Sequence, residues 1–235
     1  MVFLLFKGGE LIGQVAANAG VAETINIAKP LAAGAPPKPA LKTIDVDLYG
    51  PIYSAYLAIH YFRTNSPATG GRFVVTSSTA GLYGTADLPL YCSAKFGCVG
   101  LVRSLGLDKG MQREGITFNA ICPGWVETGL APPGMIDFVR KNCPEIITPM
   151  ATIMKAYNMF LDSDMSGNAV ECTGEFAEPR PEPDVPLSPF SETKLTLFKP
   201  IDNRNSILES FAEGAFKAEG DFDISQVGPP KELTK

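Results

Sequence analysis

The sequence is poor in histidine and has no paired cysteines. His60 is the single histidine among 235 residues, so a triad or metal cluster built on histidine would depend on it alone. Its apolar surroundings, AYLAIHYFR, favour a packing or surface role instead. The five cysteines include no Cys-x-x-Cys pair, which argues against a zinc site and a disulfide framework. We therefore expect no bound metal, and reduced thiols in a cytoplasmic protein.

The chain also lacks a cluster of basic residues and a long hydrophobic run. Its net charge of −5 argues against nucleic acid as a partner and against a polybasic membrane anchor. The apolar start, MVFLLF, is too short to span a bilayer and has no basic lead or cleavage site of a secretory signal. We expect a buried strand or the edge of a helix there, and no membrane span.

Apolar strands alternate with helices along most of the chain. Strands are expected at residues 14–20, 72–78, 116–124 and 167–174, and helices at 44–62, 88–110 and 148–162. This order predicts an α/β fold, a Rossmann-like parallel sheet with helices on both faces. We assign residues 1–175 to this domain and residues 176–235, which begin Pro-rich and acidic, to a loosely ordered tail.

Three short motifs fall at the ends of the expected strands: Asn-Ala-Gly at 18–20, Ser-Ser at 77–78 and Pro-Gly at 123–124. In a parallel sheet ligands bind at the carboxyl ends of the strands. This placement predicts a site for a small molecule at that edge of the sheet.

A proton-transfer centre is indicated by Tyr91 and Lys95, which are four residues apart and share one face of a helix. A tyrosine titrates at about pH 10, and a nearby ammonium is expected to lower its pKa so that it can exchange a proton with an alcohol oxygen. The hydroxyl of Ser78 could hold that oxygen as charge develops on it. Side chains cannot accept a hydride, so the chemistry requires a nicotinamide cofactor.

These motifs resemble the short-chain dehydrogenase/reductase family, and its compact single-domain branch. In that family a serine lies 13 positions before the tyrosine of Tyr-x-x-x-Lys, the spacing between Ser78 and Tyr91. The resemblance implies that Tyr91 transfers the proton, that Lys95 lowers its pKa and binds the nicotinamide ribose, and that Ser78 orients the substrate oxygen. The implied cofactor is NADP or NAD.

The resemblance also implies further cofactor contacts. Asn18, in the Asn-Ala-Gly motif, would lie beside the adenosine part. The Pro-Gly segment would hold the nicotinamide carboxamide through the backbone of Val126 and the hydroxyl of Thr128. Three plainer roles stay open: Asn18 as a turn residue, Thr128 as the cap of the next helix and Ser78 as a loop or cap residue.

Two features depart from the family pattern. The Thr-Gly-x-x-x-Gly-x-Gly phosphate loop is not found, and KGGELIG at 7–13 directly precedes the Asn-Ala-Gly strand, where a helix-to-strand connection belongs. We therefore expect a fold that lacks the first βαβαβ half and leaves the strand at 14–20 as an unpaired edge. Asp47 occupies the position of an asparagine that helps to hold a water in the family. It is a candidate catalytic residue or a helix-start residue.

The leading hypothesis is an NAD(P)-dependent oxidoreductase that interconverts a secondary alcohol and a ketone. The apolar segment after Thr128 allows a small lipid-like or polycyclic substrate. The alternatives are a truncated, non-catalytic binding module of the same family, and an isomerase or dehydratase that uses the same tyrosine and lysine. The expected helices at 44–62 and 88–110 could pair two copies as a homo-oligomer, since Gly97 and Gly100 suit close contact.

Overall fold

The computed structural model describes residues 2–6, 12–28, 35, 37–65, 70–131 and 134–180. By its internal contacts the chain divides into two compact units, residues 1–182 and 183–235. The second unit, which contains most of the expected tail, lies outside the described residues. The first unit contains the whole sheet and all the motifs of interest.

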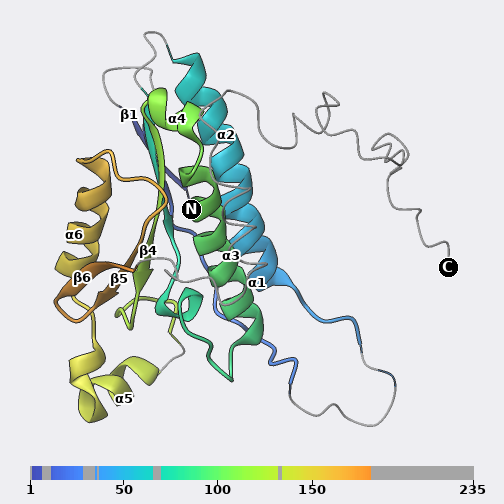
Figure 1. Cartoon of the computed structure of the whole chain (residues 1–235). Coiled ribbons are helices and arrows are strands. Elements are labelled where there is room, and N and C mark those ends of the chain that lie inside the picture. Colours follow the sequence, from blue (N-terminus) through green and yellow to red (C-terminus); the bar gives the residue numbers. More distant parts are fainter. Residues whose placement is uncertain are drawn as a thin grey trace, which may run out of the picture. The chain divides into compact units, whose positions relative to one another are not determined.

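One six-stranded sheet forms the centre of the first unit, in the order β1-β2-β3-β4-β5-β6 (Figure 1). Its strands are β1 (Val2–Phe6), β2 (Ile12–Ala17), β3 (Gly71–Thr76), β4 (Ile116–Pro123), β5 (Ala169–Thr173) and β6 (Phe176–Arg180). The four inner strands, β2 to β5, are parallel, and the two edge strands pair antiparallel. The predicted α/β class is therefore confirmed.

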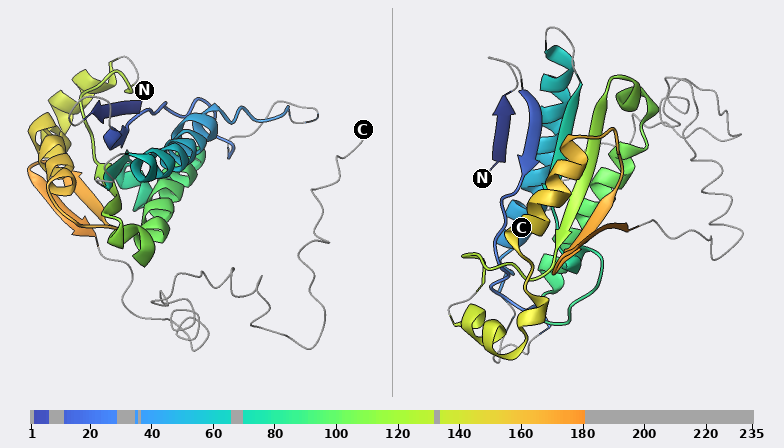
Figure 2. Two further views of the ribbon diagram at one scale, coloured as in Figure 1. Left: turned by 90° about the horizontal axis from the view of Figure 1, so that it is seen from above. Right: turned by 90° about the vertical axis from the view of Figure 1, so that its left-hand side faces the viewer.

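Helices cover both faces of the sheet, as predicted (Figure 2). α2 (Gly50–Thr64) and α3 (Pro89–Gly106) pack on one face, and α6 (Met150–Leu161) packs on the other. The shorter helices are α1 (Lys42–Ile44), η1 (Asp45–Tyr49), η2 (Thr79–Gly81), α4 (Lys109–Arg113), α5 (Met135–Asn142) and η3 (Pro144–Ile146).

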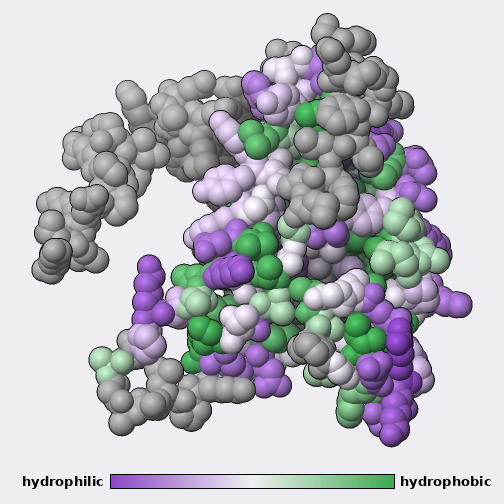
Figure 3. Space-filling view, turned by 180° about the vertical axis from the view of Figure 1, so that it is seen from behind, coloured by the Kyte–Doolittle hydropathy of each residue, from purple (hydrophilic) through white to green (hydrophobic). Residues whose placement is uncertain are grey.

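Each face of the sheet has its own hydrophobic core. Phe73 and Phe118 pack beneath α2 and α3, whereas Ile121 and Val170 pack beneath α6. All eight residues of β4 are buried because this central strand is covered from both sides. On the face of the molecule seen in Figure 3, hydrophobic residues occur in small groups among hydrophilic ones.

The two edges of the sheet differ from the prediction. β2 is not an unpaired edge, because β1 pairs with it from Val2↔Ala17 to Phe6↔Ile12 and occupies its free hydrogen-bonding groups. At the other edge, residues 176–180 were expected to be loosely ordered but form β6. A turn with Gly174 at φ +54° directs this strand back along β5.

The helix boundaries were predicted more closely. The helix expected at 44–62 is a continuous run of α1, η1 and α2, and the helix expected at 148–162 is α6. The one expected at 88–110 ends at Gly106, after which the Asp108 carboxylate accepts the Met111 N–H at 2.9 Å and starts α4. His60 lies on the exposed side of α2, next to the Tyr61 ring.

Candidate active site

A buried ion pair lies at the carboxyl end of the parallel strands. Lys95 of α3 and Asp47 of η1 approach to 3.0 Å between Nζ and Oδ2, with only 4% and 0% of their side chains exposed. The second Asp47 oxygen accepts the backbone N–H of Val21 at 2.8 Å, and Lys95 also donates to the Thr76 carbonyl at 3.1 Å. The pair therefore joins the loop after β2, the end of β3 and two helices. Asp47 is therefore not just a helix-start residue, because its carboxylate binds both the Lys95 ammonium and the Val21 N–H.

Tyr91 lies one helical turn before Lys95, whose Nζ is 5.3 Å from the centroid of the phenol ring. Burial raises the pKa of Tyr91 above its ordinary value of 10.0; Lys95 and a hydrogen bond with Ser78 lower it, and Asp47 raises it. The net direction is upward. Lys95 itself lowers this pKa, as expected, but desolvation exceeds the effect of the ammonium.

Ser78 combines a capping role with contact to the tyrosine. Its Oγ accepts the Ala80 N–H at 3.1 Å at the start of η2, donates to the Pro123 carbonyl at 3.4 Å and interacts with Tyr91. Its neighbour Ser77 is buried and donates to the Lys95 carbonyl at 2.8 Å. The structure thus separates the two serines: Ser77 holds α3 in place, and Ser78 lies beside the phenol.

The expected cofactor contacts lie on the loops after β2 and β4. Asn18 is exposed, and its Oδ1 accepts from Thr76 Oγ1 at 2.6 Å. Val126 is partly buried and packs against the hydrophobic core beneath α6. Thr128 is exposed and its Oγ1 accepts the Leu130 N–H at 3.3 Å. Because α5 begins only at residue 135, Thr128 does not cap that helix and the capping alternative is wrong.

The structure therefore brings together four of the predicted residues: Asp47, Lys95, Tyr91 and Ser78. Asn18 joins them through Thr76, whose hydroxyl it contacts and whose carbonyl binds Lys95. Val126 and Thr128 belong to the neighbouring loop and make no hydrogen bond or ion pair with this cluster among the described residues.

Sequence reasoning missed Glu23, in the loop after β2. Its Oε2 accepts the backbone N–H of Tyr91 at 2.8 Å, in the first turn of α3, where helix N–H groups have no partner within the helix. A carboxylate is also favoured there by the helix dipole. The two residues are 68 positions apart, so no local sequence pattern indicates the contact.

The ion pair leaves hydrogen-bonding capacity for a ligand. An ammonium has three donors, and Lys95 donates one of them to the Thr76 carbonyl while it forms an ion pair with Asp47. Gly20 lies over the pair, since a Cβ there would be 3.2 Å from Asp47 Oδ2 and 3.5 Å from Lys95 Nζ. The remaining donor capacity of Lys95, near the Tyr91 ring, suits the ribose hydroxyls of a nicotinamide nucleotide.

The described helices include none that is long and apolar enough to cross a membrane. In the same part of the chain, no three His, Cys, Asp or Glu side chains are grouped so that they could hold a metal ion.

A parallel sheet with helices on both faces is the architecture of a Rossmann-like domain, and the tyrosine, lysine and serine lie at the edge of the sheet where such domains bind their ligands. Residues 10–134 match the family described as short chain dehydrogenase. The chain belongs to this family.

Among curated proteins, the chain is 35% identical over 172 residues to the short-chain dehydrogenase/reductase prx6 of Penicillium rubens, covering 70% of this chain and 56% of that protein. It is 33% identical over 129 residues to bovine 15-hydroxyprostaglandin dehydrogenase [NAD(+)], covering 55% and 48%. The chain thus spans about half the length of these relatives.

Among solved structures, the NADPH-dependent 3-quinuclidinone reductase of Rhodotorula rubra is similar, with a TM-score of 0.52 and 24% identity over 68% of this chain and 60% of that one. This likeness supports the fold.

Proposed function

We propose that the protein is an NAD(P)-dependent oxidoreductase that interconverts a secondary alcohol and a ketone. The observation that carries the proposal is the grouping of Tyr91, Lys95, Ser78 and Asp47 at the carboxyl edge of the parallel strands. The family, and the dehydrogenase and reductases among the relatives, support the same reaction class.

Each residue has a separate role in this proposal. The phenol of Tyr91 gives its proton to a ketone oxygen, or as phenolate takes it from an alcohol. Ser78 holds that oxygen, since its hydroxyl can donate to the charge that develops there. Lys95 stabilises the phenolate, and Asp47 fixes the ammonium beside the phenol. The proton therefore enters and leaves the site at the Tyr91 hydroxyl.

NAD or NADP, when bound, supplies the hydride acceptor or donor that the side chains cannot provide. The free Lys95 donor and the Tyr91 hydroxyl would hold its nicotinamide ribose. Asn18 would face the adenosine part, and the Val126 backbone and Thr128 hydroxyl would hold the carboxamide. The apolar segment after Thr128 favours a small apolar substrate, including lipid-like or polycyclic compounds.

Titration of the full chain with NADH and with NADPH, followed by calorimetry, tests cofactor binding first. Tyr91→Phe then removes the reacting hydroxyl and should lower ketone reduction about 10²–10⁴-fold while nucleotide binding persists. Tyr83→Phe is the matched control, since this exposed tyrosine contacts Glu171 instead of Lys95. Failure of both nucleotides to bind, or full turnover by Tyr91→Phe, would contradict the proposal.

We also propose that two copies pair through α2 and α3. α2 exposes a row of aromatic and apolar side chains, with Tyr53 67%, Tyr56 73% and Leu57 52% exposed. Such a row on one helix favours self-association. Light scattering should give a dimer or larger species for the native chain and a smaller one for Tyr56→Glu. A monomeric native chain would contradict this part of the proposal.

A further inference from the structure

A cavity of about 420 Å³ opens beside Ser78. Four chain segments line it: η2 (Thr79), the loop after β4 (Gly124 and Trp125), η3 (Glu145 and Ile146), and the end of β5 with the turn that follows it (173–174). Thr79 directly follows Ser78, and Gly124 follows Pro123, whose carbonyl accepts from Ser78 Oγ. The cavity therefore adjoins the segments that carry Ser78 and its acceptor, although Ser78 itself does not line it.

The walls of this cavity are fixed by hydrogen bonds between segments. Thr148 donates its N–H to the Trp125 carbonyl at 2.6 Å, and its Oγ1 donates to the Cys172 carbonyl at 3.3 Å. The same Oγ1 accepts the Gly174 N–H at 3.3 Å. Thr148 thus joins three of the four segments, so the cavity is formed before a ligand enters. Its volume lies within the range of small-molecule sites, roughly 300–1,000 Å³.

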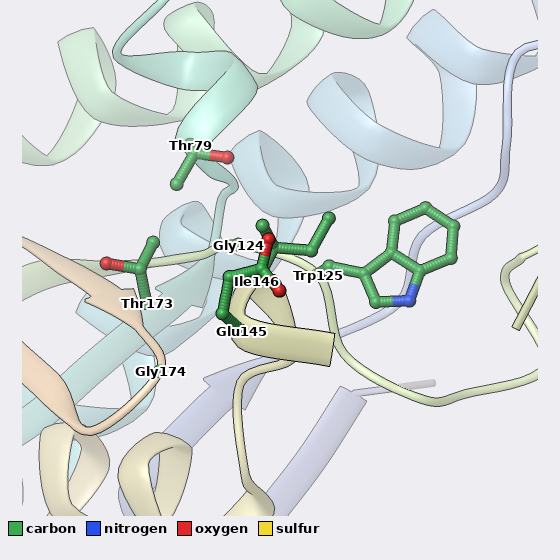
Figure 4. A pocket seen from close by; sticks show the side chains of 7 residues that line it. All are labelled: Thr79, Gly124, Trp125, Glu145, Ile146, Thr173 and Gly174. Carbon is green, nitrogen blue, oxygen red and sulfur yellow. The ribbon is translucent and has the colours of Figure 1, made fainter. Parts of the chain in front are cut away.

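Among the residues that the structure describes, Glu145 is the one charged residue that lines this cavity. Figure 4 shows its carboxylate beside Ile146, between Thr173 on one side and the Trp125 ring on the other. Within the described part of the chain no cation pairs with it. Glu171, two residues before Thr173 on β5, differs because its charge is paired with Arg180. The unbalanced charge of the cavity is therefore negative.

Building on the proposed alcohol–ketone chemistry, we infer that this cavity holds the body of the substrate. We infer further that Glu145 selects the chemical group that the substrate carries at the end away from its reacting carbon. The carboxylate binds a hydrogen-bond donor, a hydroxyl or a protonated amine, and repels a carboxylate. The substrates are thus neutral or cationic compounds with a donor group, and the apolar walls, Trp125 and Ile146, hold their carbon skeleton.

Three aryl methyl ketones that differ only in one group provide the probes: para-(aminomethyl)acetophenone, para-(hydroxymethyl)acetophenone and para-acetylbenzoate. Their affinities for the full chain are measured by calorimetry, with and without saturating NADH or NADPH, and their reduction is followed separately. We expect the amine and the alcohol to bind about 2- to 5-fold more tightly than the carboxylate, because Glu145 is exposed and solvent weakens its interactions.

Glu145→Gln should abolish the preference for the amine over the carboxylate, and Glu145→Lys should reverse it. Glu175→Gln is the matched control, because Glu175 is exposed next to Gly174 but does not line the cavity. The inference is overturned if no probe binds, if the three bind alike, or if Glu145→Lys leaves the order unchanged. The expected order of binding without any reduction would support the cavity assignment and contradict the proposed reaction instead.

Discussion

Asp47→Asn is the most informative single substitution, because it removes one charge from the buried ion pair and changes little else. Asparagine has nearly the same shape and retains an oxygen that can accept the Val21 N–H. The Lys95 ammonium would then stay buried with the Thr76 carbonyl as its remaining partner.

The expected loss of stability follows from the burial of both groups. The side chains are 0% and 4% exposed and their charged atoms are 3.0 Å apart. Removing one partner of such a pair costs about 3–5 kcal/mol, since a charge remains without compensation. The Thr76 carbonyl offsets part of this, so we expect a loss of about 3 kcal/mol. For a domain stable by about 5–15 kcal/mol this is a large fraction.

Urea unfolding of the full chain, followed by circular dichroism, measures the loss. Asp45→Asn is the matched control, because Asp45 lies two residues earlier in η1 but is exposed. It should change the free energy of unfolding by less than about 0.5 kcal/mol. The double variant Asp47→Asn with Lys95→Met removes both charges and should recover at least about 1 kcal/mol relative to the sum of the single losses.

The reasoning is refuted if Asp47→Asn is as stable as Asp45→Asn, or if the double variant loses the full sum. Either result would mean that the two side chains are not held as a charged pair in the folded protein. Asparagine at this position would then serve as well as aspartate.

Three further predictions concern neighbouring contacts. Ser78→Ala removes a hydrogen bond that lowers the pKa of Tyr91, so the pH at which alcohol oxidation rises should move upward; a pH–rate profile that stays in place would contradict this. Glu23→Ala leaves the Tyr91 N–H without its acceptor and should cost about 1 kcal/mol in thermal unfolding, whereas an unchanged Tm would show that water replaces the carboxylate. Gly106→Ala would place a Cβ 2.2 Å from the Gly167 backbone and should lower stability by about 1–3 kcal/mol, and a neutral result in urea would mean that α3 can shift there.

The inner strands of the sheet could be predicted because β-branched and apolar runs are bounded by turn residues. Residues 72–78 and 116–124 correspond to β3 and β4 for this reason. The edges could not be predicted in the same way. β1 and β6 pair antiparallel, and whether an edge segment folds back depends on long-range pairing that its own residues do not encode.

The proton-transfer residues could be found from spacing, because a helix turn brings Tyr91 and Lys95 to one face and a strand end delivers Ser78. Electrostatics was harder to predict. Spacing indicated that Lys95 lies near the phenol, but not how deeply the phenol is buried, and burial decides the direction of its pKa. Glu23, in a loop, and Glu145, in the short helix η3, escaped notice because the position of both segments is set by distant strands.

Burial and the Asp47 carboxylate shift the pKa of Tyr91 in the same direction, and this shift bears on the direction of the proposed reaction. Both raise its pKa, so at neutral pH the resting form is the phenol, with its proton in place. Reduction of a ketone begins from the phenol, whereas oxidation of an alcohol begins from the phenolate. An aspartate opposite Lys95 also offsets part of the ammonium charge that would otherwise favour the phenolate. Burial, the largest of these influences, therefore keeps Tyr91 in the phenol form, from which the proposed carbonyl reduction would begin.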